Sequence, residues 1–229
     1  TIMIVTLGRP VAPGESVNAE IEFAIDLPAY WGRWGHHNGI TYLLNWYPVL
    51  AHHDDRGWER TPFVPLHQPW HQEAGHYTVR FDLPDGQKVA SSGRVVGREP
   101  SEKGREVVTI VASPARDFAF VCSDRFETLE RRAGSTLVRV HTFAEKRANA
   151  EAMLNFACEV VPLYERWFGP YGDEEFEIAP SYFGWNGNEC SGLVLIDDRV
   201  MRLPSAGGGY LGHLVTPQTM HQWCWNVVG

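Results

Sequence analysis

The sequence predicts an α+β protein in two parts, a β-rich region at 1–133 followed by a region at 134–229 that mixes strands with helices. The first part consists of short segments rich in β-branched and aromatic residues, and Tyr77, Val79 and Phe81 alternate as one face of a half-buried strand does. After this part, apolar residues recur at steps of three and four, which is the period of an amphipathic helix. We therefore expect two domains that meet near residue 133.

Five segments of the first part have the composition of strands, and turn residues separate them. The turn after the third segment reads Pro84-Asp85-Gly86, which is typical turn chemistry. An all-β domain is the predicted result. The five predicted strands are 21–27, 39–46, 76–83, 106–112 and 118–122.

The second part begins with a predicted strand at 137–143 and continues with a predicted amphipathic helix that ends at Gly169-Pro170. Strands at 176–183 and 191–197 are expected next, and then a final helix. The predicted buried face of the first helix consists of Ala150, Met153, Leu154, Ala157, Val161, Tyr164 and Phe168.

Composition excludes several classes of protein. The 229 residues are 44% apolar, which is too high for a disordered chain, and they carry a net charge of −8. The longest basic run is Arg131-Arg132, so no nucleic-acid partner is predicted. No apolar stretch reaches the ~18 residues of a membrane span, so no transmembrane segment is predicted in this chain. Four cysteines without C-x-x-C spacing are expected to be free thiols, and they leave the compartment open.

The last 17 residues, HLVTPQTMHQWCWNVVG (213–229), are similar to a zinc-binding helix with the H-E-x-x-H motif. In that motif, two histidines four residues apart bind the metal, and the glutamate beside the first acts as general base. Here Pro217 stands at the first histidine position and Gln218 at the glutamate position. Only His221 remains as a metal ligand.

This helix resembles that of the gluzincin zinc aminopeptidases, the membrane alanyl aminopeptidase family, which reads V-x-H-E-x-x-H-Q-W-x-x-N-x-V. A second family landmark, G-x-M-E-N followed by a small residue, Gly and Leu, resembles GNECSGL at 187–193. Asn188 and Cys190 depart from the Met and Asn of that landmark. Segments 168–178 and 45–50 resemble the family's F-G-P-Y-P-Y turn and its N-W-F/Y-P segment. The residues that match the helix and the second landmark are Val215, His221, Gln222, Trp223, Asn226, Val228, Gly187, Glu189, Gly192 and Leu193.

The resemblance implies that 1–133 is the later part of an aminopeptidase-type N-terminal β domain. It also implies that 134–229 is the upper, first part of a thermolysin-like α/β catalytic domain. Zinc is the cofactor that the resemblance implies, with a third ligand further along the chain than residue 229. The implied substrate site contains Gly187, Asn188 and Glu189, and Glu189 would bind the α-amino group of a peptide.

Physical chemistry argues against zinc catalysis by this segment. His213 cannot replace the missing ligand, because its eight-residue separation from His221 spans about 12 Å of helix. Pro217 has no N–H to donate to the carbonyl of His213, so we expect the helix to begin at Thr216 or to kink there. Gln218 is not a base near neutral pH. We expect weak zinc binding or none, and no peptide hydrolysis.

Three functions therefore remain open: part of a zinc aminopeptidase-like protein with an incomplete site, a pseudopeptidase that binds peptide N-termini without cleavage, or a β-rich interaction module. For the second, we expect Glu189 on an edge strand, facing His221 across an open pocket and free of an arginine partner. Histidines also occur in H-H-D-D at 52–55 and at His67, His71 and His76. Their spacing fits no recognised zinc pattern, so we interpret 52–55 as a polar loop between strands.

Overall fold

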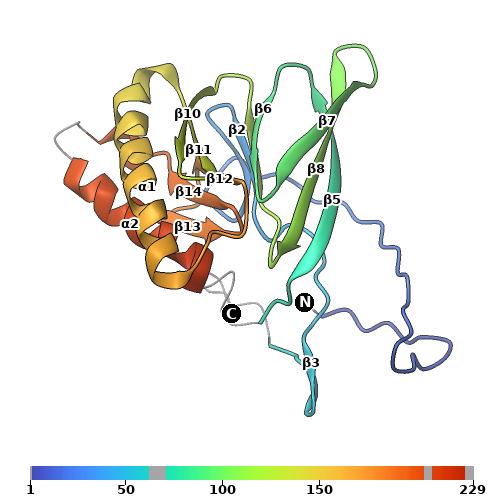
Figure 1. The fold of residues 1–229 in the computed structure, drawn as a ribbon. Helices are drawn as coiled ribbons and strands as arrows, with labels where there is room; N and C mark the ends of the chain where they lie inside the picture. Colours follow the sequence, from blue (N-terminus) through green and yellow to red (C-terminus); the bar gives the residue numbers. More distant parts are fainter. Residues whose placement is uncertain (1, 62–70, 204–207, 225–229) are drawn as a thin grey trace.

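The computed structural model describes residues 2–61, 71–203 and 208–224, and it is a mixed α+β structure in which strands predominate (Figure 1). The described residues contain two α-helices, α1 (Arg147–Phe168) and α2 (Gly208–Cys224), and two short 3-10 turns at Ala144–Lys146 and Val200–Arg202. The strands are β1 (Trp34–His37), β2 (Ile40–Leu43), β3 (His53–Asp54), β4 (Gly57–Trp58), β5 (Gly75–Pro84), β6 (Lys88–Ser91), β7 (Arg94–Pro100), β8 (Arg105–Ala115), β9 (Phe120–Ser123), β10 (Glu127–Ala133), β11 (Thr136–Thr142), β12 (Glu175–Ser181), β13 (Gly187–Cys190) and β14 (Leu193–Asp197).

The strands form three stacked sheets and one small hairpin. A five-stranded sheet has the order β10-β11-β12-β14-β13, in which the three central strands are parallel and the two edge strands are antiparallel to them. A four-stranded sheet has the order β1-β2-β9-β6, and a three-stranded sheet has the order β5-β8-β7. The β3–β4 hairpin stands apart and projects from the sheets (Figure 1).

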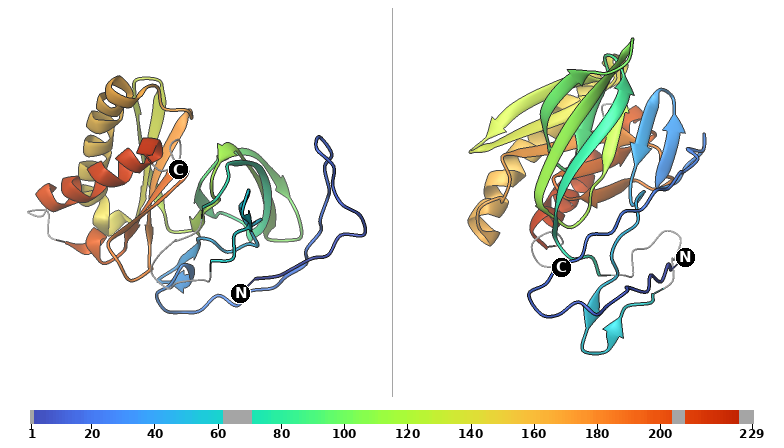
Figure 2. Two further views of the ribbon diagram at one scale, coloured as in Figure 1. Left: turned by 90° about the horizontal axis from the view of Figure 1, so that it is seen from below. Right: turned by 90° about the vertical axis from the view of Figure 1, so that its right-hand side faces the viewer.

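Alternating side chains explain why these elements stack in four layers. Along β14, Val194 and Ile196 pack against the helices, whereas Leu193 and Leu195 pack against the four-stranded sheet. Strands of the four-stranded sheet divide in the same way, and residues such as Phe120 face the three-stranded sheet. Successive side chains of a strand point to opposite faces, so a strand that is covered on both sides is apolar along most of its length. Figure 2 shows both helices on one side of the five-stranded sheet and the other sheets on its opposite side.

The helix and strand periods predicted most of these elements. Six of the seven residues expected on the inner face of α1 are buried, and the exception is Phe168, which is 48% exposed at the end of the helix. Gly169 ends α1 with a φ of 101°, a conformation that favours glycine. Predicted strands at 39–46, 76–83, 106–112 and 118–122 correspond to β2, β5, β8 and β9.

The predicted strand at 21–27 is wrong. Residues 2–30 contain no regular structure and form a long arm beside the sheets in Figures 1 and 2, and the side chains of Ile21 and Phe23 are each 45% exposed. The alternation of apolar residues is present, but no described strand pairs with this segment. A strand needs a neighbouring strand to satisfy its backbone hydrogen bonds, so the alternating pattern by itself was not sufficient to form a strand here.

The last helix does not begin at Thr216, which was one of the two expected alternatives, a kink there being the other. It begins at Gly208 and continues through Pro217 to Cys224. Pro217 lies on the exposed side of α2, where water can hydrate the carbonyl that lacks an N–H partner. Buried Leu211 and Val215 before the proline and Trp223 after it pack against α1 and the sheet, which stabilises the helix across the proline.

The expected domain division at residues 133 and 134 falls in the turn between β10 and β11. These two strands pair along their whole length within the five-stranded sheet, so this sheet includes a strand from the N-terminal side of the division. All helical residues described lie after residue 143. Neither helix among the described residues is long and apolar enough to cross a membrane.

Candidate functional site

Two sequence segments that resemble aminopeptidase motifs meet where α2 crosses the edge strand β13. Glu189 lies on β13, which is the outermost strand of the five-stranded sheet, and His221 lies in the last turn of α2. The Nδ1 atom of His221 is 3.2 Å from Oε1 of Glu189. The edge-strand position of Glu189 agrees with the expectation from the sequence, but the two side chains are in direct contact and not separated by an open pocket.

The Glu189 carboxylate raises the pKa of His221, and partial burial of the imidazole opposes this rise. The side chains of Glu189 and His221 are 24% and 34% exposed, so the pair remains accessible to a ligand. Nδ1 of His221 is shielded from solvent, yet it forms no well-aligned hydrogen bond with the described residues. The contact is therefore mainly an ion pair that exists when the imidazole is protonated.

Gln222, the next residue on α2, fixes the helix to the β13–β14 turn. Its Oε1 accepts a hydrogen bond of 2.9 Å from the backbone N–H of Gly192, and its Nε2 donates one of 3.0 Å to the carbonyl of Cys190. Gly192 has a φ of 69°, a turn conformation that favours glycine. One side chain thus satisfies two backbone groups on either side of the turn, which holds β13 and Glu189 in place beneath His221.

Trp223 anchors the same helix on its other side. Its indole Nε1 donates a hydrogen bond of 2.9 Å to the carbonyl of Gly169, and its ring packs edge-on against Tyr164 of α1 with centroids 5.7 Å apart. The hydroxyl of Tyr164 donates to the carbonyl of Thr216 at 3.2 Å. The motif residues next to His221 are therefore structural, since they determine the position of the histidine without reaching the site.

Gly187 allows α2 to approach the edge strand closely. A Cβ atom at Gly187 would lie 3.2 Å from Leu214 Cδ1 and 3.4 Å from Gln218 Cγ. Gln218 therefore packs against the backbone of β13, and its Oε1 is buried without a hydrogen-bond partner among the described residues. Asn188 donates to the carbonyl of Glu189 at 2.9 Å. Gly187 and Asn188 thus contribute to the packing and local hydrogen bonding of β13.

Further charged groups surround Glu189. Arg33 is buried, and burial lowers the pKa of its guanidinium while the negative charge of Glu189 raises it. Arg33 donates to Oδ1 of Asn45 at 2.9 Å, so the segment 45–50 supports this arginine.

Asp117 accepts a hydrogen bond of 2.7 Å from the backbone N–H of Ser191, and burial raises the pKa of Asp117. Within the described residues, Glu189 forms an ion pair with His221 and none with an arginine.

These residues do not fit a zinc ion at the motif position. Pro217 supplies no ligand atom, and Gln218 is packed against Gly187. Glu189 and His221 are joined by no third histidine, cysteine, aspartate or glutamate within reach of a shared ion in the described part of the chain. Zinc sites in proteins use at least three protein ligands. We therefore assign no chemistry that depends on zinc at this position.

The motif matches that the structure describes are Val215, His221, Gln222, Trp223, Gly187, Glu189, Gly192 and Leu193, and they cluster around the crossing of α2 and β13. Asn226 and Val228 lie outside the described residues. The segment at 168–178 forms the end of α1 and the start of β12, and its Tyr171 ring lies 5.5 Å from that of Trp223. Sequence reasoning missed Gln222 as the residue that positions the site, although its place beside His221 in the motif was a usable signal.

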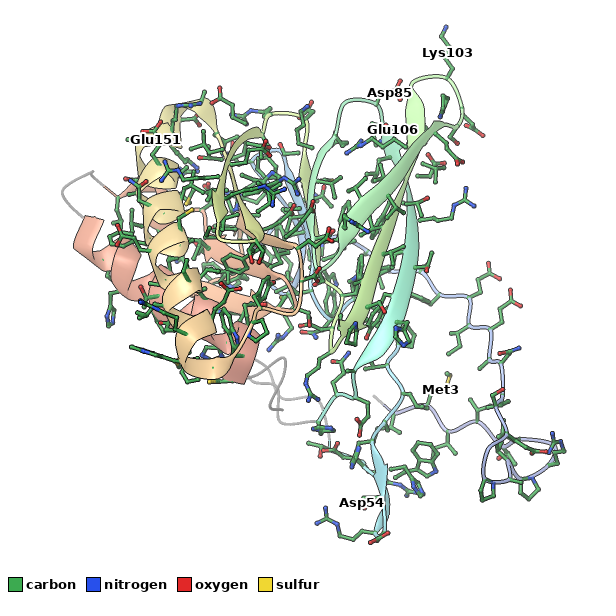
Figure 3. All side chains as sticks on the ribbon, viewed as in Figure 1. Met3, Asp54, Asp85, Lys103, Glu106 and Glu151 are labelled. Carbon is green, nitrogen blue, oxygen red and sulfur yellow. The ribbon has the colours of Figure 1, made fainter. Side chains whose placement is uncertain are left out.

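A second cluster of ligand-type side chains lies away from these motifs, at the β3–β4 hairpin. His52, His71 and Glu73 converge there, with their nitrogen and oxygen ligand atoms all within 4.8 Å of one another. The aspartates of the H-H-D-D segment are not members. Asp54 and Arg56 form a local ion pair at 2.6 Å near the tip of the hairpin, where Figure 3 labels Asp54. The interpretation of 52–55 as a polar loop is wrong for His53 and Asp54, which form β3.

Comparison with protein-family models gives no match for this sequence, and comparison with curated protein sequences gives none either.

Proposed function

We propose that this chain is a gluzincin aminopeptidase-like protein that does not hydrolyse peptides, with 1–133 as the later part of its N-terminal β domain and 134–229 as the upper part of a thermolysin-like domain. The observation that carries the proposal is the 3.2 Å contact between Glu189 and His221. The two residues are 32 positions apart and belong to two separate segments that resemble family motifs. Their convergence supports a common site.

The proposal excludes hydrolysis for two reasons that concern the residues themselves. A general base must accept a proton near neutral pH, and the amide of Gln218 cannot do so. His221 is already engaged by Glu189, and Pro217 offers no atom to hold or polarise a water molecule. Water activation therefore has no residue to carry it out at this position.

A second candidate function is binding of peptide N-termini without cleavage, and the exposure of Glu189 favours it. A half-buried carboxylate on an edge strand can accept charge-assisted hydrogen bonds from an α-ammonium group. That ammonium would compete with protonated His221 for the same oxygen atoms. Binding should therefore be tighter above the pKa of His221, where the imidazole is neutral, and should weaken again above about pH 8 as the α-amino group loses its proton.

The proposal is tested in two assays on the intact chain. In the first, aminoacyl-arylamide substrates are incubated with the protein and added zinc, and no turnover is expected. Turnover that a chelator abolishes and that the Gln218→Ala variant lacks would contradict the proposal. The same assay on the Pro217→His, Gln218→Glu double variant is expected to show no turnover, because these changes supply no third ligand near His221.

In the second assay, isothermal titration calorimetry compares a free-amine dipeptide with its N-acetylated form. Glu189→Ala should weaken binding of the free amine by about 10- to 100-fold, since a hydrogen bond to a charged group contributes about 1.5–3 kcal/mol. Glu102→Ala, which changes an exposed glutamate on the β7–β8 turn, should leave binding unchanged. Equal heats for the two dipeptides, or equal affinity of the Glu189→Ala variant, would remove peptide N-termini as the ligand.

A further inference from the structure

Three ligand-type side chains meet at the base of the β3–β4 hairpin, remote in sequence from the helix motif. Nδ1 of His52 lies 2.8 Å from Oε1 of Glu73, and Nε2 of His71 lies 3.4 Å from the same oxygen. The two imidazole rings are edge-on, with centroids 4.8 Å apart. Glu73 thus lies between two histidine nitrogens that both point to one of its oxygens.

Backbone contacts determine this arrangement. The backbone N–H of Glu59, just after β4, donates a hydrogen bond of 2.8 Å to the carbonyl of His52 and closes the hairpin. The carboxylate of Glu59 accepts from the backbone N–H of His71 at 3.4 Å, which connects the hairpin to the segment that leads into β5. Arg116 donates to the carbonyl of Gln72 at 2.9 Å and joins this segment to the three-stranded sheet. The three donors are therefore presented by two backbone segments that are connected to each other and to the body of the protein.

The close approach of Nδ1 of His52 to Oε1 of Glu73 is favourable only when a proton or a cation lies between the two atoms. Nδ1 of His52 is shielded from solvent and makes no well-aligned hydrogen bond with the described residues, although Oε1 of Glu73 is only 2.8 Å away. In a neutral imidazole whose proton is on Nε2, the Nδ1 lone pair would face a carboxylate lone pair, and these repel. Either a proton or a metal cation placed between the atoms removes this repulsion.

We propose that His52, His71 and Glu73 bind one Zn²⁺-type divalent transition-metal ion. Two imidazoles and one carboxylate form a common ligand set for zinc, whereas calcium and magnesium prefer oxygen donors alone. In a tetrahedral site with bonds of about 2.0–2.1 Å, ligand atoms are about 3.3 Å apart. The separations of 2.8 and 3.4 Å involving Glu73 are close to this value.

The ligand atoms that must move to reach bonding distance belong mainly to exposed side chains. The ligand atoms lie within 4.8 Å of one another, and the side chains of His71 and Glu73 are 39% and 67% exposed. Rotation of two exposed side chains can bring the atoms to bonding distance without displacing the core. The fourth position would be open to water, and the ion would cross-link the β3–β4 hairpin to the segment before β5.

The test is metal binding to the chelator-treated, dialysed protein, measured by zinc calorimetry and by the visible absorption of Co²⁺, which reports tetrahedral coordination. One ion per chain is expected. His52→Ala, His71→Ala and Glu73→Gln should each weaken binding by at least about 100-fold, because the loss of an outer-shell partner alone costs about 10- to 100-fold. His36→Ala, an exposed histidine on β1, should bind as the unchanged protein does.

Other outcomes would overturn the proposal. The absence of stoichiometric binding would show that the cluster is a histidine–carboxylate ion pair only. Unchanged affinity in His71→Ala and Glu73→Gln, with circular dichroism confirming that the variants are folded, would place the ion elsewhere. Loss of binding in His221→Ala alone would assign the ion to α2. Because His221 and Glu189 do not contribute to this cluster, an absence of metal binding by the chain leaves the proposed function untouched, and failure of the proposed function leaves this proposal untouched.

Discussion

Replacement of Gln222 by alanine should uncouple α2 from the edge strand that carries Glu189. The Gln222 side chain is 3% exposed and bonds to two backbone groups, the N–H of Gly192 and the carbonyl of Cys190. Alanine would leave both groups without this partner in a space that excludes most water. Each buried polar group that loses its partner costs about 1–3 kcal/mol, so we expect Gln222→Ala to lower the free energy of unfolding by about 2–6 kcal/mol. This is a large share of the roughly 5–15 kcal/mol by which proteins are stable.

Urea denaturation followed by tryptophan fluorescence measures this change, because Trp223 is adjacent to the substituted residue. Gln218→Ala is the matched control: it removes the same side chain one helical turn earlier, where Oε1 has no hydrogen-bond partner among the described residues. We expect the control to cost less than about 1 kcal/mol. An unfolding free energy of Gln222→Ala within about 0.5 kcal/mol of that of the unchanged protein, or equal losses in the two variants, would refute this role of Gln222.

Two further predictions concern the ion pair and the packing of the small sheet. Glu189→Gln should lower the pKa of His221, measured by NMR titration, because the carboxylate is the main cause of its rise. The pKa of His221 in the folded state lies above 6.5, so the stability that the His221–Glu189 pair contributes should be fully present below pH 6.5 and lost as the pH rises through that folded-state pKa. A difference in stability between the unchanged protein and Glu189→Gln that does not depend on pH would contradict this. Gly93→Ala should cost about 1–3 kcal/mol in thermal or urea unfolding, because its Cβ would lie 2.4 Å from the carbonyl oxygen of Val111. Gly97→Ala, with nothing within 4 Å of the new Cβ atom, should lower the free energy of unfolding far less. Equal losses of stability in the two variants would show that the loss of backbone freedom, and not crowding of the Cβ atom, causes both.

Local periodicity predicted the strands and helices whose apolar faces pack against other described elements. The alternation of Tyr77, Val79 and Phe81 became β5, and the three-and-four spacing from Ala150 to Tyr164 became the buried face of α1. In both cases the apolar face had a partner surface to cover it, so the local preference and the tertiary packing agreed. The same alternation at 21–27 produced no strand, because no described strand pairs with that segment.

The sequence alone also determined that 213–229 lacks two side chains of the zinc motif that it resembles, since Pro217 and Gln218 offer neither a metal ligand of the histidine type nor a general base in any fold. Only the tertiary structure decided that α2 continues through Pro217, that Gln222 holds the β13–β14 turn, and that Glu189 contacts His221 directly. It likewise brought His52 together with Glu73, 21 residues later. Spacing in sequence predicts contacts within one helix or strand, where geometry is fixed, whereas contacts between elements depend on how their buried faces pack.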